Sequence, residues 1–188
     1  MPSPRTLSLV VISLAVLGCR SNPRRASGAR SSEIEGAIAQ LRAATAAFHD
    51  IDAAVAAGYP RTVRDCLVHE HHGAMGYHHA NRALADATLE LGRPEILLYE
   101  NRPDGSYVLN GVEYVVPYRA WPRDSVAPII MGQRLKREDN LQIWYLHVWA
   151  WSRNPEGLFA DFHPDVTCPD DARRVFVPHP SSRGGTPP

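Results

Sequence analysis

The stretch QIWYLHVWAWS, residues 142–152, is rich in aromatic and branched side chains, which favour a strand because they pack well on a pleated surface. Successive side chains of a strand point to opposite faces. One face would carry Ile143, Tyr145, His147, Trp149 and Trp151, and the other Trp144, Leu146, Val148 and Ala150. The alternation therefore predicts that the imidazole of His147 lies among aromatic side chains on one face of the strand.

Further strands are predicted on the N-terminal side of this stretch. Residues 95–100 and Tyr107–Pro117 read as strands, with a bulge or second turn at Asn110 and Gly111 in the second, and residues 129–135 read as a weaker one. Turn residues separate these runs, as in the Pro-Asp-Gly of residues 103–105. The pattern predicts a small antiparallel sheet of about four strands.

Two helices are predicted before the strands. Ser32 and Glu35 have capping-box spacing, and a stripe of mostly apolar residues then recurs every three or four positions until Gly58 and Pro60 end it; it comprises Ile34, Ile38, Leu41, Thr45, Phe48, Ile51 and Val55. Asn81 could cap a second, short helix through Leu91. The expected fold class is α+β, with the long N-terminal helix and the short helix packed on the sheet.

The N-terminus predicts export. A short basic start precedes an apolar, uncharged run, residues 6–18, too short for a membrane span but typical of a signal peptide. Val16, Leu17, Gly18 and Cys19 are similar to a bacterial lipobox, which implies lipidation of Cys19, an anchor in the lipid membrane, and an outer-membrane or cell-surface location facing the periplasm or the exterior. Because Leu17 is bulky for that position, ordinary cleavage and an uncleaved anchor stay open.

The domain division follows from composition. Residues 1–19 are expected to be the signal peptide and residues 20–32, with four arginines, four serines and no acid, a flexible tether. Residues 33–177 would form a single α+β domain, and residues 178–188 a disordered tail. The chain of 188 residues has 20 basic and 20 acidic side chains, so no net charge favours nucleic acid; Lys136 is its only lysine.

Cysteine usage agrees with export. Without Cys19, the two remaining cysteines are Cys66 and Cys168, an even number that predicts a disulfide in an oxidising compartment. The bridge would close a loop of roughly 100 residues and contribute about 4–5 kcal/mol in the chain-entropy model. The alternative makes both thiols metal ligands beside the histidines.

Residues 66–79 hold five histidines, one glutamate and one methionine. Imidazole suits zinc, copper, nickel and iron, yet the spacing matches no established zinc motif. A polar exposed loop is the competing interpretation for His69, His71 and His72. His78 and His79 stand where regular structure is expected to resume, so one of them is expected to point inward.

Two ionisable residues interrupt apolar strands, Glu113 in the 107–117 strand and His147 in the 142–152 strand. A buried charge needs a partner, and the two side chains would meet if the strands are neighbours with matching faces. Adding His78 gives two histidines and one carboxylate, a set that binds zinc, iron or manganese with open positions. The competing interpretation is a structural Glu–His hydrogen bond. Possible additional ligands are His71, His72, His79 and His163.

Several motifs resemble a family of uncharacterised exported bacterial proteins. They are GAMGYH at 73–78, PEILLYE at 94–100, GVEYVVP at 111–117, LHVWAW at 146–151 and the segment from Asn154 to Cys168. The resemblance covers most of residues 43–168. It favours His78, Glu113 and His147 as shared features, whereas the family pattern has Tyr at position 79, Asn at position 163 and no His69–His72 run. It implies no activity.

Two classes of function follow. The first is an extracytoplasmic lipoprotein domain that binds a divalent metal (zinc, copper, iron or manganese) through His78, Glu113 and His147 and that could act as a mononuclear metalloenzyme. The second is a lipoprotein that binds a small molecule or partner in an aromatic pocket formed by Tyr145, Trp149 and Tyr114. No serine-centred elbow, phosphate loop or CxxC motif is present, which disfavours hydrolase, nucleotide-binding and thioredoxin-like functions.

Overall fold

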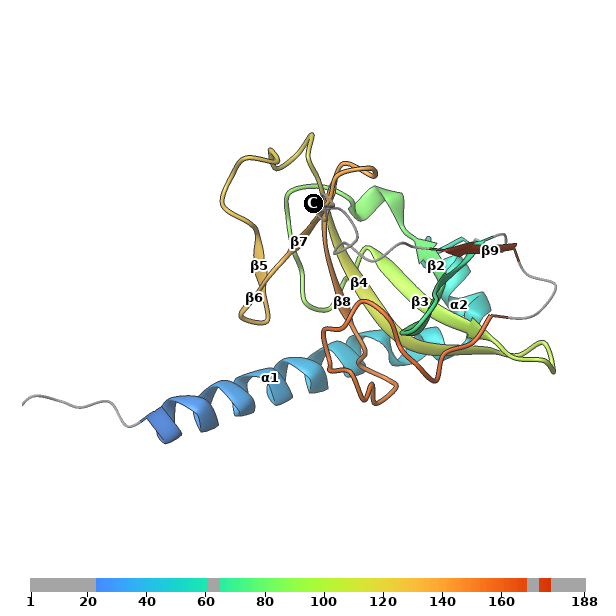
Figure 1. Cartoon of the computed structure of the whole chain (residues 1–188), viewed down its shortest axis with the longest axis horizontal. Coiled ribbons are helices and arrows are strands. Elements are labelled where there is room, and N and C mark those ends of the chain that lie inside the picture. The colour runs from blue at the N-terminus through green and yellow to red at the C-terminus, as the bar shows by residue number, and fades with distance from the viewer. Residues whose placement is uncertain (1–22, 61–64, 169–172, 177–188) are drawn as a thin grey trace, which may run out of the picture.

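The computed structural model describes residues 23–60, 65–168 and 173–176 (Figure 1). Its main element is a seven-stranded sheet in the order β7-β8-β4-β3-β2-β1-β9. The strands are β1 (Asp65–His69), β2 (Gly73–Ala80), β3 (Ile96–Asn101), β4 (Tyr107–Pro117), β7 (Lys136–Glu138), β8 (Ile143–Val148) and β9 (Arg173–Phe176). All neighbours are antiparallel except β1 and β9, which are parallel. The α+β class is confirmed, but the fold is mostly β and has more strands than predicted.

The strands predicted from residues 95–117 form as expected. The β4 strand spans Tyr107–Pro117, and its register against β3 shifts between the pairs Leu98–Gly111 and Tyr99–Leu109. Asn110 is therefore the extra residue of a bulge, as its position beside Gly111 predicted. The weak strand expected at residues 129–135 is instead a separate hairpin of two short strands, β5 (Ile129–Ile130) and β6 (Gln133–Arg134).

The first predicted helix is longer at its start and divided near its end. Helix α1 spans Pro23–Thr45, so Ser32 lies inside it and does not cap it. A 3-10 turn, Ala46–His49, and a short helix α2, Ile51–Ala56, follow. The division falls at Asp50, whose backbone is extended and whose side chain accepts the backbone N–H of Asp52 to cap α2. Asp50 thus starts a new helix within a stretch whose apolar periodicity had predicted one continuous helix.

The second predicted helix, residues 81–91, does not form. Asn81 does accept the backbone N–H of Ala83, as a cap should, but only a 3-10 turn follows, Arg82–Leu84. Asp86 then bonds the backbone N–H of Thr88. Short Asx side chains compete with the helix for backbone donors, which explains why the weak periodicity here gives irregular structure.

Of the segment expected as a polar exposed loop, residues 70–72 are the turn of a β-hairpin formed by β1 and β2, whereas His69 is the last residue of β1 and is buried, so the exposed-loop interpretation is wrong for His69. Gly76 has φ +79°, and a Cβ there would lie 2.4 Å from the carbonyl oxygen of Tyr99. A residue with a side chain is strongly disfavoured at such a position. The N-terminal half of β2 then exchanges two backbone hydrogen bonds between Ala74 and His163.

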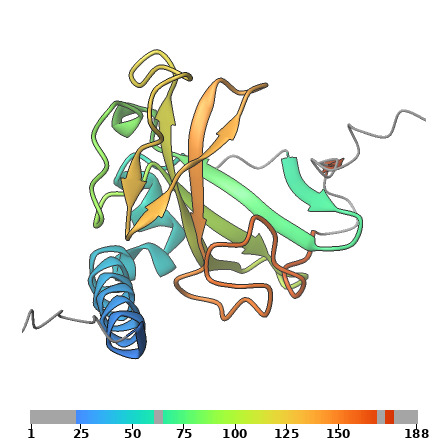
Figure 2. The same cartoon turned by 60° about the vertical axis from the view of Figure 1, so that its left-hand side comes forward.

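The two faces of the sheet are covered differently. Alternation along β4 and β8 places one set of side chains toward α1 and α2, where Ile38, Leu41, Ala54, Leu97, Val112, Tyr114, Trp144, Leu146 and Val148 form the main core. The opposite face is covered by residues 158–168, the covering loop, which contributes Val166 and Cys168 to a smaller core with Leu98 and Trp149. Figure 2 shows the blue helix α1 and the orange-red covering loop on different parts of the sheet.

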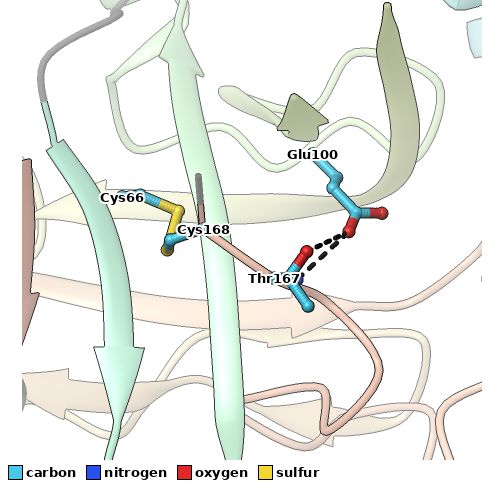
Figure 3. Close-up of a disulfide and its surroundings, with 4 residues drawn as sticks. All are labelled: Cys66, Glu100, Thr167 and Cys168. Atoms are coloured by element: carbon cyan, nitrogen blue, oxygen red, sulfur yellow. Dashed lines mark hydrogen bonds between the residues drawn. A yellow bond between two sulfur atoms is a disulfide. The ribbon is translucent and has the colours of Figure 1, made fainter. Parts of the chain in front are cut away.

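The predicted disulfide joins the sheet to the covering loop. Cys66 on β1 and Cys168 are bonded, with their Cα atoms 5.8 Å apart and a sequence separation of 102 (Figure 3). Next to it, the backbone N–H and the hydroxyl of Thr167 both donate to Oε1 of Glu100 on β3. These links hold the end of the covering loop against the strands.

The lipidation site, Cys19, and the predicted tail of residues 178–188 lie outside the described residues. Residues 23–32, predicted as part of a flexible tether, are instead the first part of helix α1. The boundaries of the single domain stay a prediction. Among the residues that the structure does describe, no helix combines the length and the apolar character needed to cross a membrane.

Candidate metal centre

Three strands bring His78, Glu113 and His147 to one place. Glu113 on β4 lies directly opposite His147 on β8. His78 on β2 pairs with Leu98 of the intervening strand β3, and Glu113 pairs with Ile96 on the other side of β3. All three side chains therefore share the face of the sheet that carries the covering loop. The predicted convergence is confirmed.

The geometry of this group suits a single ion. Nε2 of His78 lies 3.5 Å from Oε2 of Glu113, and Nε2 of His147 lies 3.7 Å from Oε1. The two imidazole rings are 5.9 Å apart at their centroids. One ligand atom from each residue lies within 4.8 Å of the other two. This set of two imidazoles and one carboxylate could hold a divalent metal ion, because zinc and iron take such ligands at about 2.0–2.2 Å.

Burial sets the electrostatics of the group. The side chains of Glu113 and His147 are 6% and 2% exposed, and that of His78 is 21% exposed, which makes it the edge nearest to solvent. Burial, together with the neighbouring His147 and His79, lowers the pKa of His78 to about 3. Burial also raises the pKa of Glu113 above its usual range, although His147 opposes that effect. His78 is therefore a neutral imidazole at physiological pH, the form that binds a metal.

Both ring nitrogens of His147 are buried, and neither forms a hydrogen bond within the described residues. Each faces a carboxylate: Nε2 faces Glu113, and Nδ1 lies 3.7 Å from Oδ1 of Asp161. An imidazole buried without hydrogen bonds costs free energy unless something else satisfies it. A cation between Nε2 and Glu113 would do so.

Asp161 was not identified from the sequence. It lies in the covering loop, where Lys136 of β7 donates to its Oδ1 at 2.5 Å and to the carbonyl oxygen of Phe159. Burial acts to raise the pKa of Asp161, but the imidazole of His147 and the ammonium of Lys136 outweigh it and lower the pKa to about 2. An irregular loop has no periodicity from which an aspartate could be assigned to the site. The one unusual sequence feature that involves Asp161 is its partner Lys136, the single lysine of the chain.

The possible additional ligands lie elsewhere. His79 is fully buried on the helix-covered face, with its ring 4.8 Å from that of Tyr99. His72 contacts Glu156 at 2.9 Å, and His71 is exposed at the hairpin turn. His163 is buried beside Trp149, and its Nδ1 accepts the backbone N–H of Asp165. The group of potential ligands found among the described residues includes none of these four.

The residues expected to form an aromatic pocket are divided between the two faces. Tyr145 and Trp149 share the face of His147, with ring centroids 5.5 and 6.3 Å from its own. The indole N–H of Trp149 donates to the carbonyl oxygen of Ala160, which anchors the covering loop. Tyr114 points to the helix-covered face, where its hydroxyl donates to the carbonyl oxygen of Leu91.

Comparisons of the chain with protein-family models, with curated proteins and with solved structures give no match.

Proposed function

We propose that this chain is a metal-binding domain that holds one divalent transition metal ion through His78, Glu113 and His147. The observation that carries the proposal is the convergence of three ligand atoms within 4.8 Å from three different strands. Two imidazole nitrogens and one carboxylate leave positions open in a tetrahedral or octahedral shell. Zinc, iron and manganese fit this donor set best, and copper is the remaining candidate.

Charge supports the same proposal. Glu113 is buried between the imidazoles of His78 and His147. The pKa of His78 is lowered to about 3, so this imidazole supplies no positive charge near neutral pH. The ionised form of Glu113 would need a cation in such a place. A divalent ion would provide one and would also satisfy Nε2 of His147. With open positions, a bound ion can activate water or polarise a carbonyl group, which is why a mononuclear metalloenzyme is the form of activity we favour.

The test is metal analysis of protein purified without a histidine tag. Wild type incubated with zinc and then desalted should retain close to one ion per chain, and a competing chelator should give its affinity. His78→Ala is the informative variant, because this partly exposed residue is the most easily replaced of the three. His71→Ala, an exposed histidine of the same hairpin, is the matched control.

The proposal requires that His78→Ala lose the ion and His71→Ala keep it. Equal zinc contents in the two variants, or no retention by wild type, would reject it. Binding of a small molecule or partner at Tyr145 and Trp149 would then be the better function, with the Glu113–His147 pair as a structural contact.

We also propose that the domain works outside the cytoplasm, anchored to a membrane by lipid on Cys19. The apolar run and lipobox of residues 6–19 support this location, and so does the Cys66–Cys168 disulfide, because disulfides persist in oxidising compartments.

A further inference from the structure

His147 lies between two carboxylates that approach opposite nitrogens of its ring. Oε1 of Glu113 lies 3.7 Å from Nε2, and Oδ1 of Asp161 lies 3.7 Å from Nδ1. A neutral imidazole carries one N–H donor and one lone pair. A lone pair that faces a carboxylate oxygen is repelled by it unless a proton or a metal cation lies between them, and a neutral ring has only one N–H, so the two sides of the ring play different roles.

The surroundings decide which side carries the proton. The Glu113 side also holds Nε2 of His78, so three potential ligand atoms meet there. On the Asp161 side, the search of the described residues finds no further group of potential ligands, and a cation is already present as the ammonium of Lys136, in contact with Oδ1. The proton therefore belongs on Nδ1, toward Asp161, and the lone pair belongs on Nε2, toward the ion.

We propose that Asp161 is a positioning residue of the metal site, which orients His147 and fixes its Nδ1–H tautomer, and that Lys136 holds Asp161 in place for this role. The inference rests on the proposed function, since it describes how the same site presents one of its ligands. A carboxylate that accepts the second N–H of a ligating histidine raises the basicity of that ligand and orients its ring.

Lys136 contributes geometry that an arginine would not match. Its ammonium binds the carboxylate of Asp161 and the carbonyl oxygen of Phe159, two acceptors close together in the covering loop. It is also the only lysine of the chain. A compact ammonium can serve two neighbouring acceptors in different directions, whereas a guanidinium presents a planar fork.

The experiment compares zinc affinity and histidine tautomers in wild type, Asp161→Ala, Asp161→Asn and the control Asp165→Ala. Asp165 is an exposed aspartate of the same loop. Asp161→Ala should weaken zinc binding about 10- to 100-fold, the usual cost of removing an outer partner of a metal ligand. Asp161→Asn keeps an acceptor oxygen and should recover part of the loss, while Asp165→Ala should stay within about twofold of wild type.

Nitrogen-15 spectra of the histidines provide a readout that a merely structural role would not move. In the zinc-bound wild type His147 should show a protonated Nδ1 and a metal-bound Nε2, and in Asp161→Ala this tautomer signature should weaken or exchange. Circular dichroism and disulfide mapping establish that each variant folds.

The outcomes separate the two proposals. If wild type binds zinc and Asp161→Ala binds it equally tightly with the same tautomer, Asp161 has no positioning role and the metal site stands. Suppose that His147 is an imidazolium bonded to both carboxylates in zinc-free and in zinc-treated wild type. Then Glu113, His147 and Asp161 form an ion-pair network, and both proposals fail.

Discussion

Glu95, immediately before β3, and Glu113 on β4 are both buried carboxylates, 2% and 5% exposed, yet they have different surroundings. Glu95 lies on the helix-covered side, where its Oε2 accepts the backbone N–H of Val115. Glu113 lies on the face of the covering loop between the imidazoles of His78 and His147. Burial alone therefore does not distinguish the two carboxylates; the two imidazoles that converge on Glu113 do.

The faces also differ in how they are held. On the helix-covered face, apolar packing dominates, and the hydroxyl groups of Tyr59, Tyr99 and Tyr114 donate to backbone carbonyls. The loop-covered face depends on links at particular points, among them the disulfide and the contact between Lys136 and Asp161. The comparison predicts that the stability of the loop-covered face depends mainly on its cross-links, and that of the helix-covered face mainly on the packing of side-chain volume.

The largest expected effect is on the disulfide of the loop-covered face. A Cys66→Ser, Cys168→Ser double variant should lose about 4 kcal/mol of unfolding free energy in urea titration, because the open chain regains the entropy of a long loop. Reduction of wild type with dithiothreitol should have the same effect. A loss below about 1 kcal/mol would show that the other links suffice to hold the covering loop.

The next effect separates the two carboxylates directly. Glu113→Gln should weaken zinc binding by more than about 100-fold, since even outer partners of metal ligands contribute 10- to 100-fold. Glu95→Gln, the matched change on the other face, should leave the zinc affinity unchanged. Chelator competition measures both. Equal losses would mean that the two positions are coupled and that the distinction between the faces is wrong.

A smaller effect concerns the pH dependence of stability through Glu95. Burial is the main cause that raises its pKa to about 7. The titratable groups around it are Asp86, Glu113, Tyr59 and Tyr114. Because the folded state holds this proton more tightly than the unfolded state does, the stability that the proton contributes is complete below about pH 4.5 and is lost as the pH rises through about 7.

Urea titrations of wild type and Glu95→Gln at pH 5 and pH 8 measure this contribution. The stability of wild type should fall relative to that of the variant by about 2 kcal/mol between these pH values. Since glutamine still offers an oxygen to the N–H of Val115, the variant should fold. A constant difference across this range would mean that Glu95 does not titrate there.

The smallest effect on the domain is that of Cys19→Ser. It should leave the unfolding free energy unchanged and move the protein from the membrane fraction to the soluble extracytoplasmic fraction. Fractionation and mass spectrometry of the mature N-terminus measure the outcome. A wild-type protein that is already soluble, with an N-terminus at another residue, would contradict lipidation.

The predictable part of the fold is the part with strong alternation. β4 and β8 combine branched and aromatic residues with period two, so the faces of Glu113 and His147 followed from the sequence. That the two strands are neighbours in matching register, so that the two residues meet, comes from the structure. The bulge at Asn110 followed from the Asn-Gly pair. The disulfide was predicted from the expected export and the even number of cysteines, which left one pairing; the structure decides it against metal ligation by the two thiols.

The part that could not be predicted is built from backbone interactions. The hairpin of β1 and β2 buries Ala74, Met75 and Tyr77, yet it carries so many histidines that it resembles a polar loop. The turns at Asp50 and Asp86 interrupt periodicity through single side-chain hydrogen bonds. Asp161 reaches the site only because the covering loop folds back over the sheet, a contact that no local pattern encodes.

The order of assembly follows from where the four residues of the site originate. His78, Glu113, His147 and Asp161 belong to β2, β4, β8 and the covering loop, so no hairpin taken alone contains the site. Contacts between distant segments form late, because the entropy of closing long loops opposes them. A metal that binds only the folded chain would add RT ln(1 + [L]/Kd) to its stability. Metal binding would therefore indicate that the covering loop has folded onto the sheet and that the domain is complete.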